Sequence, residues 1–96
     1  MPERDTILQC LRAGLPELRR EFPLRRLALF GSIVRDGATP ESDIDVLAEV
    51  EPSIGLRFVT LAERLEALTH RKIDLVSRRA IKPSLWKIIE PDLVDV

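Results

Sequence analysis

The sequence predicts a single-domain α/β (α+β) fold, in which helices and strands alternate as α-β-α-β-α-β and the helices pack on a small mixed sheet. Apolar residues recur at spacings of three and four in residues 7–18 and 58–68, as in amphipathic helices. Short apolar runs at residues 24–30, 43–50 and 72–77 are typical of strands. The 96 residues can enclose one modest core, so we assign residues 1–96 to one domain.

Composition narrows the class of protein. With 15 basic and 16 acidic residues the net charge is −1, which does not favour direct nucleic-acid binding. Apolar residues make up 45% of the chain, as in a globular protein, and no apolar run approaches the roughly 20 residues of a membrane span. Cys10 is the only cysteine and the N-terminus lacks the apolar region of a signal peptide. We therefore expect a cytoplasmic protein without disulfides.

The N-terminal half begins with an amphipathic helix that contains a proline. Pro16 removes a backbone donor, so we expect a kink or a break at residues 14–16. The first strand, Leu24–Phe30, becomes continuously apolar, as a strand covered on both faces does. Gly31 and Ser32 follow it directly, and we expect one short helical turn over Ile33–Asp36, with free N–H groups facing the glycine.

The C-terminal half contains two further strands and two helices. The second strand is expected at Asp43–Val50 and the third at Lys72–Ser77, with the helix of residues 58–68 between them. A short helix is expected from Pro83 to about Pro91, with Pro83 in its first turn. Leu93–Val96 is expected to add an edge strand. The apolar residues of the last helix are interpreted as a satellite core or, alternatively, as an exposed docking patch for a partner: Leu85, Trp86 and Ile89.

The second strand opens with two carboxylates one residue apart. Side chains alternate along a strand, so Asp43 and Asp45 point to the same face. Two adjacent like charges are unfavourable alone, because each raises the pKa of the other, and a divalent cation between them relieves the repulsion. This pattern predicts a metal site.

Topology predicts that a third carboxylate joins this pair. An antiparallel arrangement of the first two strands brings Gly31 and Ser32 beside Asp43 and Asp45. The third strand follows a full helix, which favours a parallel neighbour, and Asp74 lies early in it. All these residues should therefore meet at one edge of the sheet.

These residues resemble the minimal nucleotidyltransferases of the DNA polymerase β superfamily. The likeness rests on Gly31-Ser32, Arg35, the run Ser42-Asp43-Ile44-Asp45, and Asp74 within Lys-Ile-Asp-Leu-Val, in the order and at the spacing of that family. It covers nearly the whole chain. It implies the polymerase β-like nucleotidyltransferase fold, with a three-stranded mixed core in sequential order.

Nucleotidyl transfer explains the residue types. The reaction moves an α-phosphoryl group from ATP to a hydroxyl, so it depends on positioning and on neutralising charge. Asp43 and Asp45 are predicted to bind Mg²⁺, and Asp74 to bind a second Mg²⁺ or to accept the proton of the hydroxyl. The predicted nucleotide-binding groups are the Gly31 backbone, the Ser32 hydroxyl, Arg35 and Ser42.

Each assignment has a structural alternative. Asp43 could cap its loop, Asp45 could face solvent on a half-exposed strand, and Asp74 could be a structural hydrogen-bond acceptor. Arg35 could be a surface residue at a helix start. The catalytic interpretation is preferred because the motif elements occur together.

The resemblance also implies a partner. Single-domain members act on a co-encoded HEPN-domain RNase toxin, which they neutralise by attaching AMP to a tyrosine, and this suggests a hetero-oligomer. The chain itself contains no tyrosine, which excludes tyrosine self-modification. Two alternatives stay open: an enzyme with a small-molecule acceptor such as an aminoglycoside, whose pocket a partner completes, and a non-catalytic antitoxin that neutralises by binding.

Overall fold

The computed structural model describes residues 3–35 and 37–96. Helices and strands alternate along the chain, as the sequence predicts, if the short 3₁₀ helix η1 (Gly31–Ile33) between the first two strands is counted. Their order is α1 (Glu3–Glu21), β1 (Leu24–Phe30), β2 (Ile44–Val50), α2 (Arg57–Thr69), β3 (Ile73–Ser77), α3 (Pro83–Ile89) and β4 (Val94–Asp95). No helix among these residues is long and apolar enough to cross a membrane.

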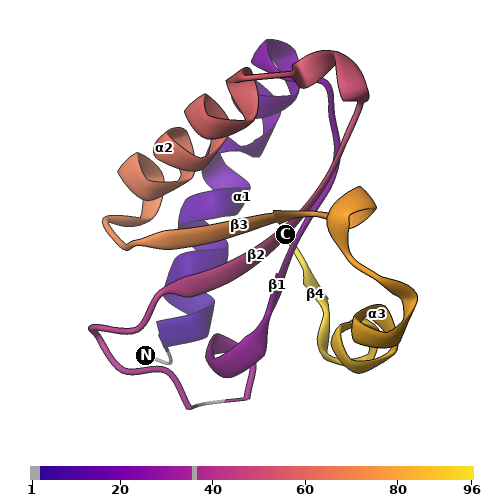
Figure 1. Ribbon diagram of the computed structural model, residues 1–96. Helices are drawn as coiled ribbons and strands as arrows, with labels where there is room; N and C mark the ends of the chain where they lie inside the picture. The colour runs from indigo at the N-terminus through magenta and orange to yellow at the C-terminus, as the bar shows by residue number, and fades with distance from the viewer. Residues whose placement is uncertain (1–2, 36) are drawn as a thin grey trace.

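The strands form one four-stranded sheet in the order β3-β2-β1-β4. β2 pairs antiparallel with β1 and parallel with β3, which confirms the predicted mixed pairing (Figure 1). The expected edge strand at the C-terminus is also present, because β4 pairs antiparallel with β1. The two predicted carboxylate-bearing strands, β2 and β3, are therefore direct neighbours.

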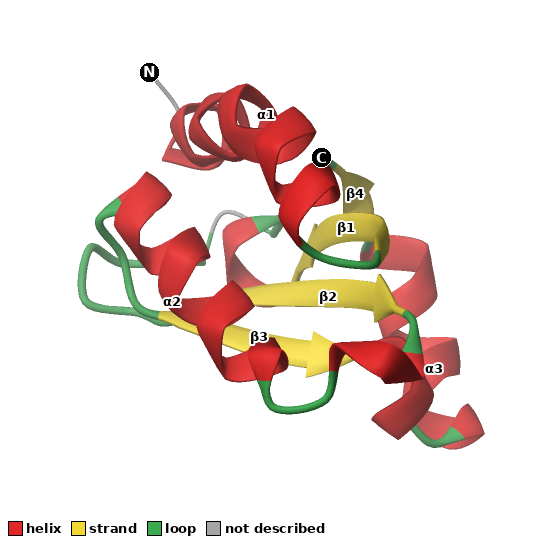
Figure 2. Ribbon diagram, turned by 90° about the horizontal axis from the view of Figure 1, so that it is seen from above, coloured by secondary structure: helices red, strands yellow, loops and turns green. Residues whose placement is uncertain are grey.

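The two faces of the sheet carry different layers (Figures 1 and 2). α1 and α2 cover one face, and their buried leucines pack with Leu27, Leu29, Ile44, Val46 and Ala48 of β1 and β2 in the main core. α3 covers part of the other face, where Ile89 packs with Ala28 and Leu47 in a second cluster. The alternation along β2 thus sends Ile44 and Val46 to one layer and Leu47 to the other.

Of the kink or break expected in the first helix, the break is wrong. α1 runs without interruption from Glu3 to Glu21 and contains Pro16. Leu11 and Leu18 lie on either side of the proline, and both are buried in the main core. Burial of the helix on both sides of Pro16 therefore outweighs the loss of one backbone hydrogen bond.

The short turn after β1 begins earlier than expected. A 3₁₀ helix, η1, spans Gly31–Ile33, and the amides of Val34 and Arg35 donate to the Gly31 carbonyl oxygen at 3.1 and 3.3 Å. The expected helical turn over Ile33–Asp36 is therefore displaced toward the glycine, and Asp36 lies outside the described residues. The turn starts directly at the end of β1, beside β2.

Candidate functional site

Asp45 and Asp74 lie side by side on adjacent parallel strands. They are register partners in the pairing of β2 with β3, so their side chains leave the same face of the sheet. This is the face covered by α3, because Leu47 and Val76, two residues further along each strand, pack in the cluster with Ile89. The structure therefore brings the second and third predicted carboxylates together.

The electrostatics of Asp45 show that Asp43 belongs to the same neighbourhood. Burial raises the pKa of the Asp45 carboxyl above its ordinary value, and the negative charges of Asp74 and Asp43 raise this pKa further. The guanidinium of Arg35 acts in the opposite direction and lowers it. Asp43 itself is exposed and lies immediately before the first residue of β2.

Gly31 lies directly over the Asp45 carboxylate. Its φ of +76° is in the left-handed region, and a Cβ atom built on it would collide with the Oδ2 atom of Asp45. Phe30, the preceding residue, is the register partner of Asp45 in β1. Only glycine allows the Asp45 carboxylate to lie this close to the backbone.

A pocket of about 350 Å³ joins these groups. Four predicted site residues line it: Gly31, Arg35, Asp45 and Asp74. Its remaining lining is mostly apolar and comes from β1, β3 and the segment that begins at α3: Phe30, Val76, Leu85, Ile88, Ile89 and Asp92. The pocket thus combines the carboxylates of Asp45 and Asp74 and the guanidinium of Arg35 with an apolar wall.

Asp92 is a site residue that sequence reasoning missed. Its Oδ2 atom lies 3.6 Å from Nη1 of Arg35 in an ion pair across the pocket. Asp92 follows α3 in a short 3₁₀ turn, Glu90–Asp92, far from the motif residues in sequence. No spacing pattern connects the two, so only the tertiary structure reveals the contact.

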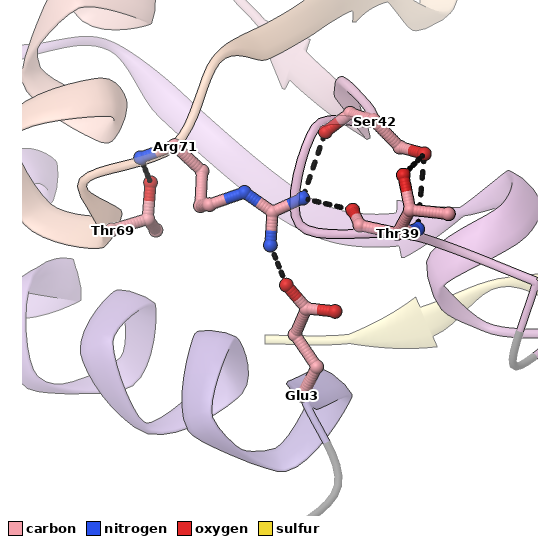
Figure 3. Close-up of polar contacts among 5 residues, drawn as sticks. All are labelled: Glu3, Thr39, Ser42, Thr69 and Arg71. Carbon is pink, nitrogen blue, oxygen red and sulfur yellow. Dashed lines mark hydrogen bonds and ion pairs between the residues drawn. The ribbon is translucent and has the colours of Figure 1, made fainter.

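Ser32, Ser42 and Asp43 do not line the pocket. The Ser42 hydroxyl accepts a hydrogen bond from the Thr39 amide and shares another with the Thr39 hydroxyl, both at 3.0 Å (Figure 3). In this structure the Ser42 side chain therefore stabilises its own loop.

The expected satellite core of the last helix is only partly correct. Ile89 is buried and Trp86 packs against the same cluster, beneath the guanidinium of Arg78 at 3.7 Å from the ring centroid. Leu85 is instead 48% exposed, and Ile88, one turn along on the same helix, is 66% exposed. A seven-residue helix can bury only one stripe, so these two side chains remain at the pocket.

The arrangement suits a divalent cation. Among residues 3–35 and 37–96, no three Asp, Glu, His or Cys side chains are already gathered at metal-binding distances. The pair of Asp45 and Asp74 nevertheless supplies the oxygen ligands that Mg²⁺ prefers and leaves coordination positions open for phosphate. A cation would also relieve the repulsion that raises the pKa of Asp45.

Comparison with known proteins identifies the family. The model of the nucleotidyltransferase domain family matches residues 11–96. The chain belongs to this family. It is 38% identical over 94 residues to the protein adenylyltransferase MntA of Thermococcus cleftensis, a match that covers 96% of this chain and 94% of that protein.

Solved structures support the same fold. A minimal nucleotidyltransferase matches with a TM-score of 0.81 and 28% identity, over 97% of this chain and 95% of that one. A complex of tri-AMPylated Shewanella oneidensis HEPN toxin with MNT antitoxin matches with a TM-score of 0.58 and 21% identity, over 97% of this chain and 67% of the matched chain. The predicted polymerase β-like fold is therefore confirmed.

Proposed function

We propose that this nucleotidyltransferase uses ATP and Mg²⁺ to transfer AMP to a tyrosine hydroxyl of a partner HEPN toxin, and so acts as an antitoxin. The observation that carries the proposal is the register pairing of Asp45 with Asp74 beneath Gly31, in a pocket that Arg35 also lines. The relationship to protein adenylyltransferase MntA supports AMP as the transferred group. The AMPylated HEPN toxin in the related complex supports the acceptor.

The chemistry is an in-line displacement at the α-phosphorus. The acceptor oxygen forms a bond to phosphorus, the bond to the bridging oxygen breaks, and pyrophosphate leaves with the electron pair. Mg²⁺, when bound, supplies positive charge against the phosphate oxygens. The chain must therefore hold the cations, fix the phosphates and receive the proton of the hydroxyl.

Each group has a role that follows from its position. Asp43 and Asp45 would hold a cation shared with the phosphates, and Asp74 would hold a second one or accept the hydroxyl proton. Gly31 allows the phosphates to approach the backbone, and N–H groups at the start of η1, with the Ser32 hydroxyl, would bind them. Arg35 is 63% exposed at the pocket, where it can reach a phosphate without losing a buried partner.

The acceptor would come from another chain. The pocket of about 350 Å³ is small and open, and the chain contains no tyrosine. A protein acceptor can supply the hydroxyl and complete the wall of the pocket at the same time. A hetero-oligomer with the toxin is therefore part of the proposal.

Intact-mass spectrometry tests the proposal. The purified protein is mixed with the product of the neighbouring gene, ATP and Mg²⁺, and both proteins are weighed. We expect an AMP-sized gain on the neighbour that is absent with Asp45→Asn and retained with Asp95→Asn. Asp95 is a matched control, because it lies on β4, pairs with Arg26 and does not line the pocket.

The other outcomes separate the alternatives. Transfer to an aminoglycoside with no gain on the neighbour would replace the protein acceptor with a small molecule. Full neutralisation of the toxin by an Asp43→Ala, Asp45→Ala double variant would replace catalysis with binding alone.

A further inference from the structure

Arg71 is a mostly buried arginine that joins three segments of the chain. It lies between α2 and β3, and its side chain is only 14% exposed. Its Nη2 atom donates to the carbonyl oxygens of Thr39 and Ser42, at 2.8 Å each, and its Nη1 atom is ion-paired with Glu3 at the start of α1 (Figure 3). Arg71 is not among the residues that line the pocket, so its role is not in the pocket itself.

The bonds of Arg71 end on the peptide unit that leads into Asp43. The Ser42 carbonyl belongs to the Ser42–Asp43 peptide bond, and on the other side of Asp43 the Ile44 amide donates to the Lys72 carbonyl at 2.9 Å. Asp43 is therefore held on both sides by the segment 71–72. Without the arginine side chain, the Ser42 carbonyl would lose this partner, and the turn would keep its internal bonds and the backbone bond from Ile44 to Lys72.

The same arginine is fixed to the strand that carries Asp74. Its backbone amide donates to the Thr69 hydroxyl at 3.3 Å, and the Ile73 amide donates to Oε2 of Glu66 at 3.1 Å, which ties the entry of β3 to the end of α2. The guanidinium thus connects the backbone before Asp43 to the backbone before Asp74. Asp43 and Asp74, the two carboxylates whose charges act on Asp45, therefore each follow a backbone segment that is held at Arg71.

We propose that Arg71 is a positioning residue of the metal site: it holds the Thr39–Ser42 turn so that Asp43 stays within reach of a cation bound by Asp45 and Asp74. The proposal rests on the metal-dependent function proposed above. Its physical basis is that charge-assisted hydrogen bonds to carbonyl groups are strong and that outer groups orient the ligands of a metal. Loss of the arginine would leave Asp43 free to move toward solvent, away from the other carboxylates.

The geometry requires arginine rather than lysine. The two terminal nitrogens of the guanidinium serve different partners, the loop carbonyls and Glu3, in a fixed planar fork. A lysine ammonium has a single nitrogen and cannot reach both. Glu3 is 36% exposed, so we expect its ion pair to contribute less than the two carbonyl contacts at 2.8 Å.

Cation binding and hydrogen exchange test this role directly. Calorimetry with Mn²⁺ alone, and with Mg²⁺ in the presence of a non-hydrolysable ATP analogue, gives the affinity of each variant. We expect Arg71→Met to weaken cation binding by about 10- to 100-fold, Arg71→Lys by less, and Glu3→Gln by about twofold or less. Amides of residues 39–44 should exchange faster in Arg71→Met, and the Mg²⁺ concentration for half-maximal AMP transfer should rise by the same factor as the dissociation constant.

Arg64→Met is the matched control. Arg64 also joins the region of α2 to α1, through Glu21 and Glu17, but at the end of the helices away from the loop. The Arg64→Met substitution should lower the melting temperature without changing the affinity for Mn²⁺ or Mg²⁺. Wild-type cation affinity in folded Arg71→Met would overturn the proposal, and if that variant does not fold, wild-type affinity in Arg71→Lys would do so.

The readouts distinguish this proposal from the proposed function. If the wild-type protein binds the cation but transfers no AMP, the proposed enzymatic function is refuted. The cation affinities of the Arg71 variants then still decide whether Arg71 positions the metal site. Wild-type protein that binds neither Mn²⁺ nor Mg²⁺ would overturn both.

Discussion

The two faces of the sheet differ in what they contribute: one is an apolar core that stabilises the fold, and the other carries the carboxylates of the candidate site. Toward α1 and α2, β2 presents Ile44, Val46 and Ala48, all fully buried in a continuous apolar core. Toward α3 it presents Asp45 and Leu47, and the carboxylate there is crowded by like charge and burial, which raises its pKa. One face therefore stabilises the fold, whereas the other places charges whose repulsion opposes folding and which the proposed cation would neutralise.

Asp45→Asn should show the difference between the two faces most clearly, because it should lower activity and raise stability. Activity should fall by about a thousandfold or more, because the variant removes a ligand of the proposed cation. The metal-free protein should become more stable, with a higher melting temperature, because a crowded charge is removed. AMP transfer and thermal unfolding in EDTA measure the two effects, and a large fall in melting temperature would contradict the comparison.

The raised pKa also predicts how stability changes with pH. In the metal-free wild type, the native Asp45 carboxyl binds its proton more tightly than the unfolded one does, so this group contributes most stability at low pH. That contribution should decline as pH rises from the ordinary pKa of aspartate through the raised native value. The decline should be absent from Asp45→Asn, as compared by denaturant titrations at several pH values.

Leu61→Ala probes the opposite face. Leu61 is 0% exposed in the core between α2 and the sheet, so truncation should cost about 2–5 kcal/mol of unfolding free energy. Activity per folded molecule should stay near the wild-type value at a temperature where the variant is folded. Urea titration gives the first quantity and active-site-normalised turnover the second, and a selective loss of turnover would mean that the core also tunes the site.

Gly31→Ala should affect both properties moderately. The backbone strain at φ +76° should cost about 1–2 kcal/mol, and the new methyl group would displace the Asp45 carboxylate and lower activity about 10- to 100-fold. Gly55→Ala is a matched control, because Gly55 has a φ of +53° with no atom within 4 Å of an added Cβ. It should lose similar stability and keep its activity. Equal activity losses in both variants would show that strain alone, rather than the contact with Asp45, matters.

The difference between the faces also explains what the sequence could predict. Alternation along β2 predicts that Asp43 and Asp45 share a face, and the helix between β2 and β3 predicts the parallel neighbour that carries Asp74. These are periodic features of contiguous segments. The strands themselves follow for the same reason, although β2 and β3 each begin one residue later than predicted and the C-terminal strand is limited to Val94–Asp95.

The contacts that the sequence did not predict are made by turns and by chain ends. Asp92 reaches Arg35, and Arg71 reaches Glu3, Thr39 and Ser42, across distances in sequence that no spacing rule covers. At Pro16 the sequence predicted an interruption that the structure does not have. The general rule that proline breaks a helix is outweighed there by burial of the helix on both sides of the proline. Local pattern therefore predicts candidate site residues such as Asp45 and Asp74, which the structure brings together, and tertiary packing decides what holds them in place.

Asp92→Asn should have the smallest effect, and it tests whether Arg35 belongs to the chemical face. The pair is partly exposed and 3.6 Å apart, so stability should change by less than about 1 kcal/mol. If Arg35 binds a phosphate, Asp92 competes for it, and the variant should lower the KM for ATP about twofold with kcat unchanged. Arg35→Gln should raise the same KM. Steady-state kinetics at saturating Mg²⁺ measure both, and a KM that neither variant moves would make Arg35 a surface residue that happens to line the pocket.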